Sequence, residues 1–176
     1  SALIGVTKKG TIKRCSLDQL NTNRKNGIKI INLKDGDELI DIKQTSGDDN
    51  VIIVTKDGKS IRINENDVRP MGRTAAGVRG INLEGEDEVV SMSLVKPGEK
   101  LLVVTQKGYG KRTTEDEYKV QVRGGKGILT YDKKKFGKTG AIVGAMVVGE
   151  EDEVLMINSN GIVTPTRSEE RRVGKE

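Results

Sequence analysis

The sequence predicts an all-β fold made of repeated four-stranded blades, arranged as in a propeller-like ring. A short pattern recurs along the chain, at Val6–Gly10, Val54–Gly58 and Val104–Gly108, and more weakly at Ile157–Gly161. Its glycines, at positions 10, 58, 108 and 161, are separated by 48, 50 and 53 residues. Aromatic residues make up only 2% of the 176 residues. Several small cores of Val, Ile and Leu suit this composition better than one large core.

The second repeat shows the predicted strands most clearly. Glu38–Thr45 alternates apolar and polar residues, which is typical of a half-buried strand. Val51–Val54 is continuously apolar and β-branched, which predicts a strand covered on both faces. Lys56–Gly58 predicts a tight hairpin turn, since Asp-Gly tolerates a positive φ. Ser60–Asn64 alternates again, and Gly77–Leu83 is predicted to be a fourth extended segment.

The other repeats follow the same order. Their first strands are predicted at Glu88–Val95 and Ile142–Val148, and their apolar strands at Leu101–Val104 and Val154–Ile157. The first repeat lacks its opening strand and the fourth lacks its closing strand, so we expect an excerpt of a longer array with two complete and two partial blades. The predicted division is 1–45 (partial blade), 46–96 (blade junction and second-blade hairpins), 97–148 (third blade), 149–167 (partial fourth blade) and 168–176 (a non-native tail resembling cloning-adapter read-through).

The composition excludes several kinds of site. There is no histidine and Cys15 is the only cysteine, so an internal disulfide, a Cys/His zinc site and histidine-based catalysis are all excluded. A lone thiol fits a reducing cytoplasm, and no apolar run approaches the length of a membrane span. The formal charge of +5 and the pI near 9.2 suit a polyanionic partner, although a solvated basic surface explains them equally well.

Cations recur at equivalent places in the repeats. One set lies three or four residues after the hairpin glycine: Lys13, Arg14, Arg62, Lys111 and Arg112. A second set falls on the predicted fourth strands: Lys29, Arg79 and Lys126. On alternating strands these side chains are expected to project away from the apolar face. Stacked repeats would then carry a basic rim suited to a phosphate backbone, with little reading of bases. The alternative is that edge strands carry Lys and Arg to prevent aggregation.

The segment Gln121–Gly127, which reads Gln-Val-Arg-Gly-Gly-Lys-Gly, is the strongest local signal. Its paired glycines allow backbone to approach a phosphate, while Arg123 and Lys126 supply charge. It is not a nucleotide P-loop, because it lacks the Gly-Lys-Ser/Thr ending and no helical pattern follows.

Four segments resemble the C-terminal domain of the A subunit of bacterial DNA gyrase: 34–40, 68–73, 74–81 and 106–113. The resemblance extends over about residues 2 to 167. It implies a β-pinwheel, a propeller-like disc of about six blades in which an outer strand crosses between neighbours. It also implies a basic rim that wraps duplex DNA and so supports negative supercoiling.

The family's hallmark heptad reads Gln, basic, Arg, Gly, Gly, basic, Gly and lies in the first blade. Gln121–Gly127 matches six of the seven positions, with Val122 in place of a basic residue, and lies in a later repeat. We therefore interpret it as a variant copy and expect the hallmark heptad upstream. The resulting set of expected DNA contacts is Lys13, Arg14, Lys29, Arg62, Arg73, Arg79, Lys111, Arg112, Arg123 and Lys126.

The resemblance also implies what lies elsewhere in the parent enzyme. The DNA-cleaving tyrosine belongs to the N-terminal part of the A subunit, so Tyr109, Tyr118 and Tyr131 are expected to be structural. ATP hydrolysis belongs to the B subunit, and neither a cofactor nor a metal is expected here. The acidic runs 35–38, 84–88 and 150–153 are interpreted as solvated connections. The expected partners are double-stranded DNA, a second gyrase A subunit and the gyrase B subunit. No association with a membrane is expected.

Two alternatives remain from the sequence. The A subunit of topoisomerase IV has a similar disc with fewer blades and degenerate heptads, which the variant heptad fits. A protein-interaction propeller is the other alternative, and it would carry an exposed apolar patch and a neutral rim.

Overall fold

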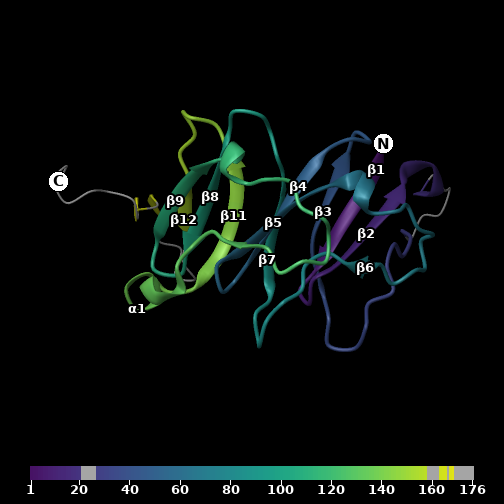
Figure 1. The fold of residues 1–176 in the computed structure, drawn as a ribbon, viewed down its shortest axis with the longest axis horizontal. Helices are drawn as coiled ribbons and strands as arrows, with labels where there is room; N and C mark the ends of the chain where they lie inside the picture. The colour runs from purple at the N-terminus through teal and green to yellow at the C-terminus, as the bar shows by residue number, and fades with distance from the viewer. Residues whose placement is uncertain (21–26, 158–162, 166, 169–176) are drawn as a thin grey trace.

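The computed structural model describes residues 1–20, 27–157, 163–165 and 167–168. These residues form three four-stranded sheets and one two-stranded sheet, which follow one another along the long axis of the molecule (Figure 1). The predicted all-β fold of repeated four-stranded sheets is confirmed. Within the described ranges, no helix has both the length and the apolar character needed to cross a membrane.

The strands have the following bounds. Sheet 1 has the order β3 (Leu39–Thr45), β1 (Ala2–Thr7), β2 (Thr11–Ser16), β6 (Val78–Arg79). Sheet 2 has the order β10 (Ile128–Leu129), β5 (Lys59–Asn64), β4 (Asn50–Thr55), β7 (Val89–Leu94). Sheet 3 has the order β11 (Ile142–Val148), β8 (Lys100–Thr105), β9 (Tyr109–Thr114), β14 (Arg167–Ser168). Sheet 4 pairs β12 (Leu155–Ile157) with β13 (Val163–Pro165).

The helices are short and lie in the connections. They are the 3-10 turns η1 (Leu17–Leu20), η2 (Glu65–Asp67), η3 (Glu115–Glu117) and η4 (Lys133–Lys135), and the single α-helical turn α1 (Phe136–Thr139). Of the predicted tail, only Ser168 lies within the described residues, at the end of β14. The weak fourth hairpin glycine, Gly161, lies outside them.

The sequence repeat and the sheet do not coincide. The hairpin β4–β5 forms the centre of sheet 2, but the strands before and after it in the chain, β3 and β6, both pair in sheet 1. In the same way, β7 and β10 flank the hairpin β8–β9 in sequence and pair in sheet 2. Each repeat thus gives its hairpin to one sheet and two outer strands to the preceding sheet. This crossing of outer strands between neighbouring sheets agrees with the β-pinwheel that the family resemblance implies, so one sheet is not built from the four consecutive strands of one repeat. The domain boundaries inferred from the repeat remain a prediction.

The hairpin turns explain the recurring Val-Thr-x-x-Gly pattern. The hydroxyl oxygens of Thr7, Thr55 and Thr105 each accept a hydrogen bond from the backbone N–H four residues later, at 3.1, 3.0 and 3.1 Å. The glycine of each turn adopts a positive φ, of +93°, +96° and +90°. Thr and Gly therefore recur because the turn needs a side-chain acceptor followed by a left-handed residue.

The apolar central strands separate successive cores. Val51 and Ile53 of β4 face the core between sheets 1 and 2, whereas Ile52 and Val54 face the core between sheets 2 and 3. All four side chains are buried, which confirms the predicted strand covered on both faces. The next central strand, β8, alternates in the same way between the second core and a third one beyond sheet 3. Stacked sheets of this kind bury short strands mainly with Val, Ile and Leu, and among the described residues only the second core adds aromatic side chains, those of Tyr118, Tyr131 and Phe136.

The sheets converge at one edge. Strand β7 lies between β3 and β11 and packs against both, and the Ser91 hydroxyl of β7 donates to the Ala145 carbonyl of β11 at 2.8 Å. The two-residue strands β6 and β10 form the opposite edge of sheets 1 and 2. The connections that contain β6 and β10 therefore form the outer edge of the array.

Candidate nucleic-acid interface

Three connecting segments, here called the rim loops, lie along this outer edge: residues 27–34, 69–83 and 119–130. Backbone hydrogen bonds join each rim loop to the next. Asn32 N donates to Ala75 O at 3.4 Å, and its equivalent fifty residues later, Asn82, donates to Gly125 O at 2.8 Å. Gly124 N also donates to Gly80 O at 2.7 Å. The rim loops are thus held in fixed register across sheets 1 and 2.

Five of the ten predicted DNA contacts lie on the rim loops with solvent access. Lys29, Arg79 and Lys126 are exposed, while Arg73 and Arg123 are half-buried. Arg123 is held in place because its backbone N–H donates to Asp67 Oδ2 at 2.7 Å and its guanidinium donates to Arg79 O at 3.1 Å. Lys126 lies 3.7 Å from Glu84 Oε1, and both side chains are largely exposed, so this ion pair is weak.

Lys13 is buried, with 3% of its surface exposed, and this corrects the expectation that it projects into solvent. Its ammonium donates to the carbonyl oxygens of Ile30 and Arg73 at 2.6 Å and of Ala75 at 2.7 Å. Burial lowers the pKa of this ammonium below its ordinary value of 10.5. Lys13 therefore joins the first two rim loops from beneath and is not presented to a phosphate.

Replacing Lys13 by Met is expected to lower the free energy of unfolding by about 2 kcal/mol, because three partly buried carbonyls then lose a charged donor. Urea unfolding followed by far-UV circular dichroism would measure this loss. The control is Lys29→Met, which alters an exposed side chain and should change stability by less than about 0.5 kcal/mol. Equal midpoints for Lys13→Met and the unaltered chain would contradict the assignment.

Arg14 and Arg62 join neighbouring repeats instead of facing DNA. Arg14 Nη2 lies 3.2 Å from Glu65 Oε1, and its Nη1 donates to Val68 O at 3.2 Å. The equivalent Arg62 lies 2.6 Å from Glu115 Oε2, and it also donates to carbonyl oxygens of the η3 turn. Each arginine therefore binds the 3-10 turn of the following repeat through an ion pair and hydrogen bonds to backbone carbonyls. The expectation that they project outward is wrong because the next repeat covers them.

The Arg62–Glu115 pair gives stability a pH dependence. The hydrogen bond from Arg62, with a further one from the Gly98 N–H, lowers the pKa of Glu115 below its ordinary 4.5. A carboxyl with a lowered folded-state pKa stabilises above its unfolded pKa and loses that effect as pH falls through the folded value. The stability advantage of the unaltered chain over Glu115→Gln should therefore shrink below about pH 4.5. Urea midpoints measured from neutral pH to about pH 3 test this, and a constant difference would contradict it.

Lys111 and Arg112 also have partners within the chain. Lys111 Nζ donates to Thr130 O at 3.4 Å, and Arg112 donates to Asp152 O at 2.7 Å and to Gly149 O at 3.4 Å. Both are half-buried. The predicted contacts thus divide into five cations of the rim loops and five that hold the repeats together.

The glycines of the variant heptad serve the packing of the chain on itself. Gly124 and Gly127 have φ values of +85° and +74°. A Cβ on Gly127 would lie 2.3 Å from Ser60 O, and a Cβ on the equivalent Gly77 would lie 2.7 Å from Ile12 O. The loop must therefore approach the adjacent strand closely. Val122, which replaces a basic residue of the family heptad, is 75% exposed.

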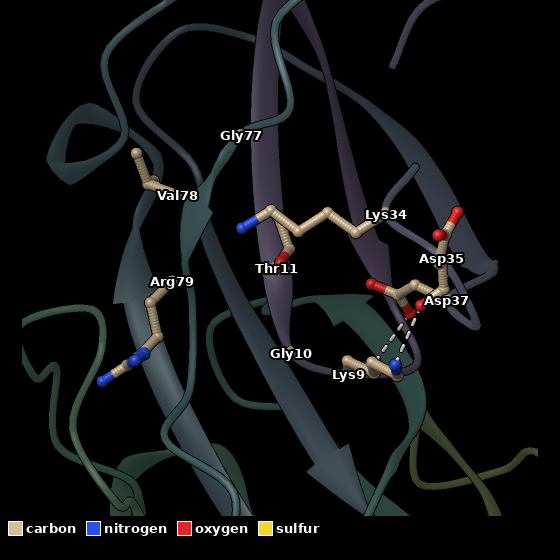
Figure 2. Close-up of a pocket in the computed structure, with 9 residues that line it drawn as sticks. All are labelled: Lys9, Gly10, Thr11, Lys34, Asp35, Asp37, Gly77, Val78 and Arg79. Atoms are coloured by element: carbon tan, nitrogen blue, oxygen red, sulfur yellow. Dashed lines mark hydrogen bonds between the residues drawn. The ribbon is translucent and has the colours of Figure 1, made fainter. Parts of the chain in front are cut away.

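Sequence reasoning missed further cations on the rim loops and beside them. An open groove of about 630 Å³ lies between residues 34–37 and β6. Its lining includes the cations Lys9, Lys34 and Arg79 and the carboxylates Asp35 and Asp37. Figure 2 shows Lys34 reaching across this groove toward Thr11 and β6, while Arg79 extends away from Lys9. A second groove, of about 820 Å³, contains Arg69 and Arg123. The residues that line one groove come from separate repeats, so the sequence pattern alone held no signal for them.

Acidic and tyrosine side chains have structural partners here. Asp37 Oδ1 accepts from Lys9 N, and the equivalent Asp87 Oδ1 accepts from Asp57 N, both at 2.9 Å. Asp87 is only 9% exposed, so the interpretation of these acidic runs as merely solvated connections is wrong for it. The tyrosines pack locally: Tyr118 bonds to Thr130, Tyr131 stacks on Phe136, and Tyr109 lies beneath the Lys138 ammonium.

Comparison with known proteins identifies relatives along most of the chain. The family model described as the DNA gyrase C-terminal domain, beta-propeller, matches residues 2–46, 49–96 and 99–149. The DNA gyrase A subunit of Clostridium acetobutylicum is 56% identical over 162 residues, which are 92% of this chain and 19% of that protein. The DNA gyrase A subunit of Mycolicibacterium smegmatis is 41% identical over 179 residues, covering 99% of this chain and 21% of that protein. The chain thus spans about a fifth of the length of these relatives.

Solved structures show the same architecture. A C-terminal domain of DNA topoisomerase IV matches with a TM-score of 0.85 and 26% identity, over 94% of this chain and 52% of that one. A DNA gyrase A C-terminal domain matches with a TM-score of 0.79 and 30% identity, over 94% of this chain and 55% of that one.

Proposed function

This chain belongs to the DNA gyrase C-terminal domain family, and from that membership we propose that it binds and bends duplex DNA along its outer edge, with little sequence preference. The supporting observation is the row of solvent-accessible cations on rim loops that are hydrogen-bonded to one another in register. A row of cations fixed along one edge suits the phosphate backbone of a duplex, and phosphate contacts position DNA without reading its bases.

The parent protein is proposed to be the A subunit of DNA gyrase, a type IIA topoisomerase of the cytoplasm. In this proposal the chain itself is not catalytic. The DNA-cleaving tyrosine lies elsewhere in the parent protein, and ATP and Mg²⁺ act on other domains or subunits. The proposed partners are a second A subunit, the gyrase B subunit and the duplex itself. DNA wrapped on this edge would be directed toward the enzyme's own gate and so favour negative supercoils.

The salt dependence of DNA binding tests this proposal. If the five predicted contacts on the rim loops meet phosphates, they should together contribute roughly −4.5 to the slope of log K against log salt on linear duplex. Arg79→Ala should make the slope shallower by about 0.9 and weaken binding equally on unrelated sequences. The control is Lys43→Ala on β3, at the inner edge, which should leave the slope unchanged. A salt-independent affinity, or a loss confined to one DNA sequence, would contradict the proposal.

Two other functions have some support. The topoisomerase IV match favours the A subunit of that enzyme as an alternative parent, and the variant heptad agrees with it. A gyrase parent should introduce negative supercoils into relaxed plasmid with ATP and the B subunit, whereas topoisomerase IV should only relax or decatenate. A protein-interaction surface is favoured by exposed apolar residues in and beside the third rim loop: Val120, Val122, Ile128 and Leu129. The cations of the rim loops favour DNA over this last alternative.

A further inference from the structure

The outer strands of sheets 1 and 2 carry different residues at the same register position. In sheet 1, Arg79 of β6 pairs with Thr11 of β2. In sheet 2, Leu129 of β10 pairs with Lys59 of β5. Thr11 and Lys59 are equivalent, because each directly follows the glycine of its hairpin turn. Sheet 1 thus has its cation on the outer strand, and sheet 2 has it on the neighbouring strand.

This register corrects the sequence alignment of the fourth strands. That alignment treated Lys126 as the equivalent of Arg79. The strand pairing shows that the equivalent residue is Leu129, and that Lys126 lies three residues earlier, in the heptad. Leu129 is 58% exposed, so no burial accounts for the loss of a cation at this position. Lys59 is half-buried, which is typical of a lysine stem lying on a strand with its ammonium in water.

Directly opposed residues of an antiparallel pair lie on one face, with Cβ atoms about 5 Å apart. A lysine side chain is longer than this separation, so the Lys59 ammonium can reach the region of sheet 2 that the Arg79 guanidinium occupies in sheet 1. Figure 2 shows the sheet 1 version of the pair, with the short Thr11 side chain on β2 and the long Arg79 side chain on β6.

Sheet 3 provides a cation beside the same position by another route. Tyr109 follows the third hairpin glycine and is therefore equivalent to Thr11 and Lys59. The ammonium of Lys138, from the single turn α1, lies 5.3 Å from the centre of the Tyr109 ring. Basic residues therefore occur at or beside this register position in all three sheets: Arg79 on the outer strand of sheet 1, Lys59 on the neighbouring strand of sheet 2, and Arg167 of the outer strand β14, which pairs with Tyr109, in sheet 3.

We propose that Lys59 contacts a DNA phosphate beside the outer strand of sheet 2, taking across the strand pair the place that Arg79 has in sheet 1. This inference rests on the proposed function, since the phosphate is that of the DNA duplex on the outer edge. It adds a phosphate contact at a register position where the outer strand of sheet 2 is apolar, besides Arg123 and Lys126 of the third rim loop.

The test removes the cation from β5 and then introduces one on the outer strand β10. Lys59→Thr reproduces the sheet 1 residue and should make the slope of log K against log salt shallower by about 0.9 on linear duplex. The double variant Lys59→Thr with Leu129→Arg reproduces the whole sheet 1 pair and should restore the original slope. Lys43→Thr, the same change at the inner edge, should leave the slope unaltered. Thermal unfolding by circular dichroism should give closely similar midpoints for all variants, since the Lys59 backbone bond to Thr55 is kept.

The outcomes separate the two proposals. If the unaltered chain binds duplex without salt dependence, the proposed function itself fails. If it binds with the expected slope and Arg79→Ala reduces that slope, but Lys59→Thr does not, only the role of Lys59 is overturned. A reduced slope that Leu129→Arg does not restore would also overturn the cross-strand replacement, because the cation would then be needed on β5 alone.

Discussion

Replacing Glu65 by alanine is expected to lower the free energy of unfolding by about 3–5 kcal/mol, the cost of breaking a buried ion pair from one side. The Glu65 carboxylate is fully buried. It accepts hydrogen bonds from the Thr45 hydroxyl at 2.7 Å and from the backbone N–H groups of Gly47 and Asp49 at 3.1 and 2.6 Å, besides its ion pair with Arg14. Its removal deprives the backbone N–H groups of Gly47 and Asp49 of their acceptor and leaves the buried Arg14 guanidinium without a counter-charge, with only the Val68 carbonyl still bonded to it.

The equivalent pair in the next repeat provides the matched control. Arg62 and Glu115 keep 15% and 16% of their side-chain surface exposed, so water can replace part of the lost interaction. Glu115→Ala should therefore destabilise less than Glu65→Ala, although the two residues are at the same repeat position. Urea unfolding followed by far-UV circular dichroism compares the variants, since the chain contains no Trp. Equal losses would show that burial does not set the strength of this contact between repeats.

These arginines show where sequence reasoning reaches its limit. The spacing from the hairpin glycine placed Arg14 and Arg62 at equivalent points, which is correct, but it could not show which side of the sheet the next repeat covers. Arg14 and Glu65 are 51 residues apart in the chain, and their contact depends on how the sheets stack. A cation that recurs in every repeat can bind either the neighbouring repeat or an external ligand. Periodicity alone does not show which of these two roles it has.

The local features were predicted more successfully than the pairing of strands. The threonine and glycine of each hairpin act within five residues of one another, so the turns could be read directly from the sequence. The two-residue strands β6 and β10 depend instead on distant partners, Ile12 and Ser60 among them. Their register decides that Leu129, and not Lys126, occupies the place of Arg79. Short outer strands carry too little pattern to fix that register from the sequence alone.

The second large effect is expected for Gly58→Ala, which should destabilise the chain by about 3 kcal/mol or more. Gly58 has φ of +96°, a conformation that side chains disfavour by about 1–2 kcal/mol. In addition, a Cβ here would lie 2.1 Å from the carbonyl oxygen of Tyr131, so the hairpin and the end of the third rim loop would have to separate. That separation would weaken the hydrogen bonds that Thr130 N and Tyr131 N donate to Gly58 O, at 2.7 and 3.2 Å.

Gly85→Ala distinguishes the steric cost from the conformational one. Gly85 also has a positive φ, of +58°, but no atom lies within 4 Å of the position of its Cβ. This variant should lose only about 1 kcal/mol, the cost of the left-handed conformation. Urea midpoints compare the two stabilities, and amide hydrogen exchange at Thr130 reports whether the contact with Gly58 has opened. If Gly58→Ala cost no more than Gly85→Ala and left Thr130 protected, close contact between the hairpin and the third rim loop would not be what fixes that loop on sheet 2.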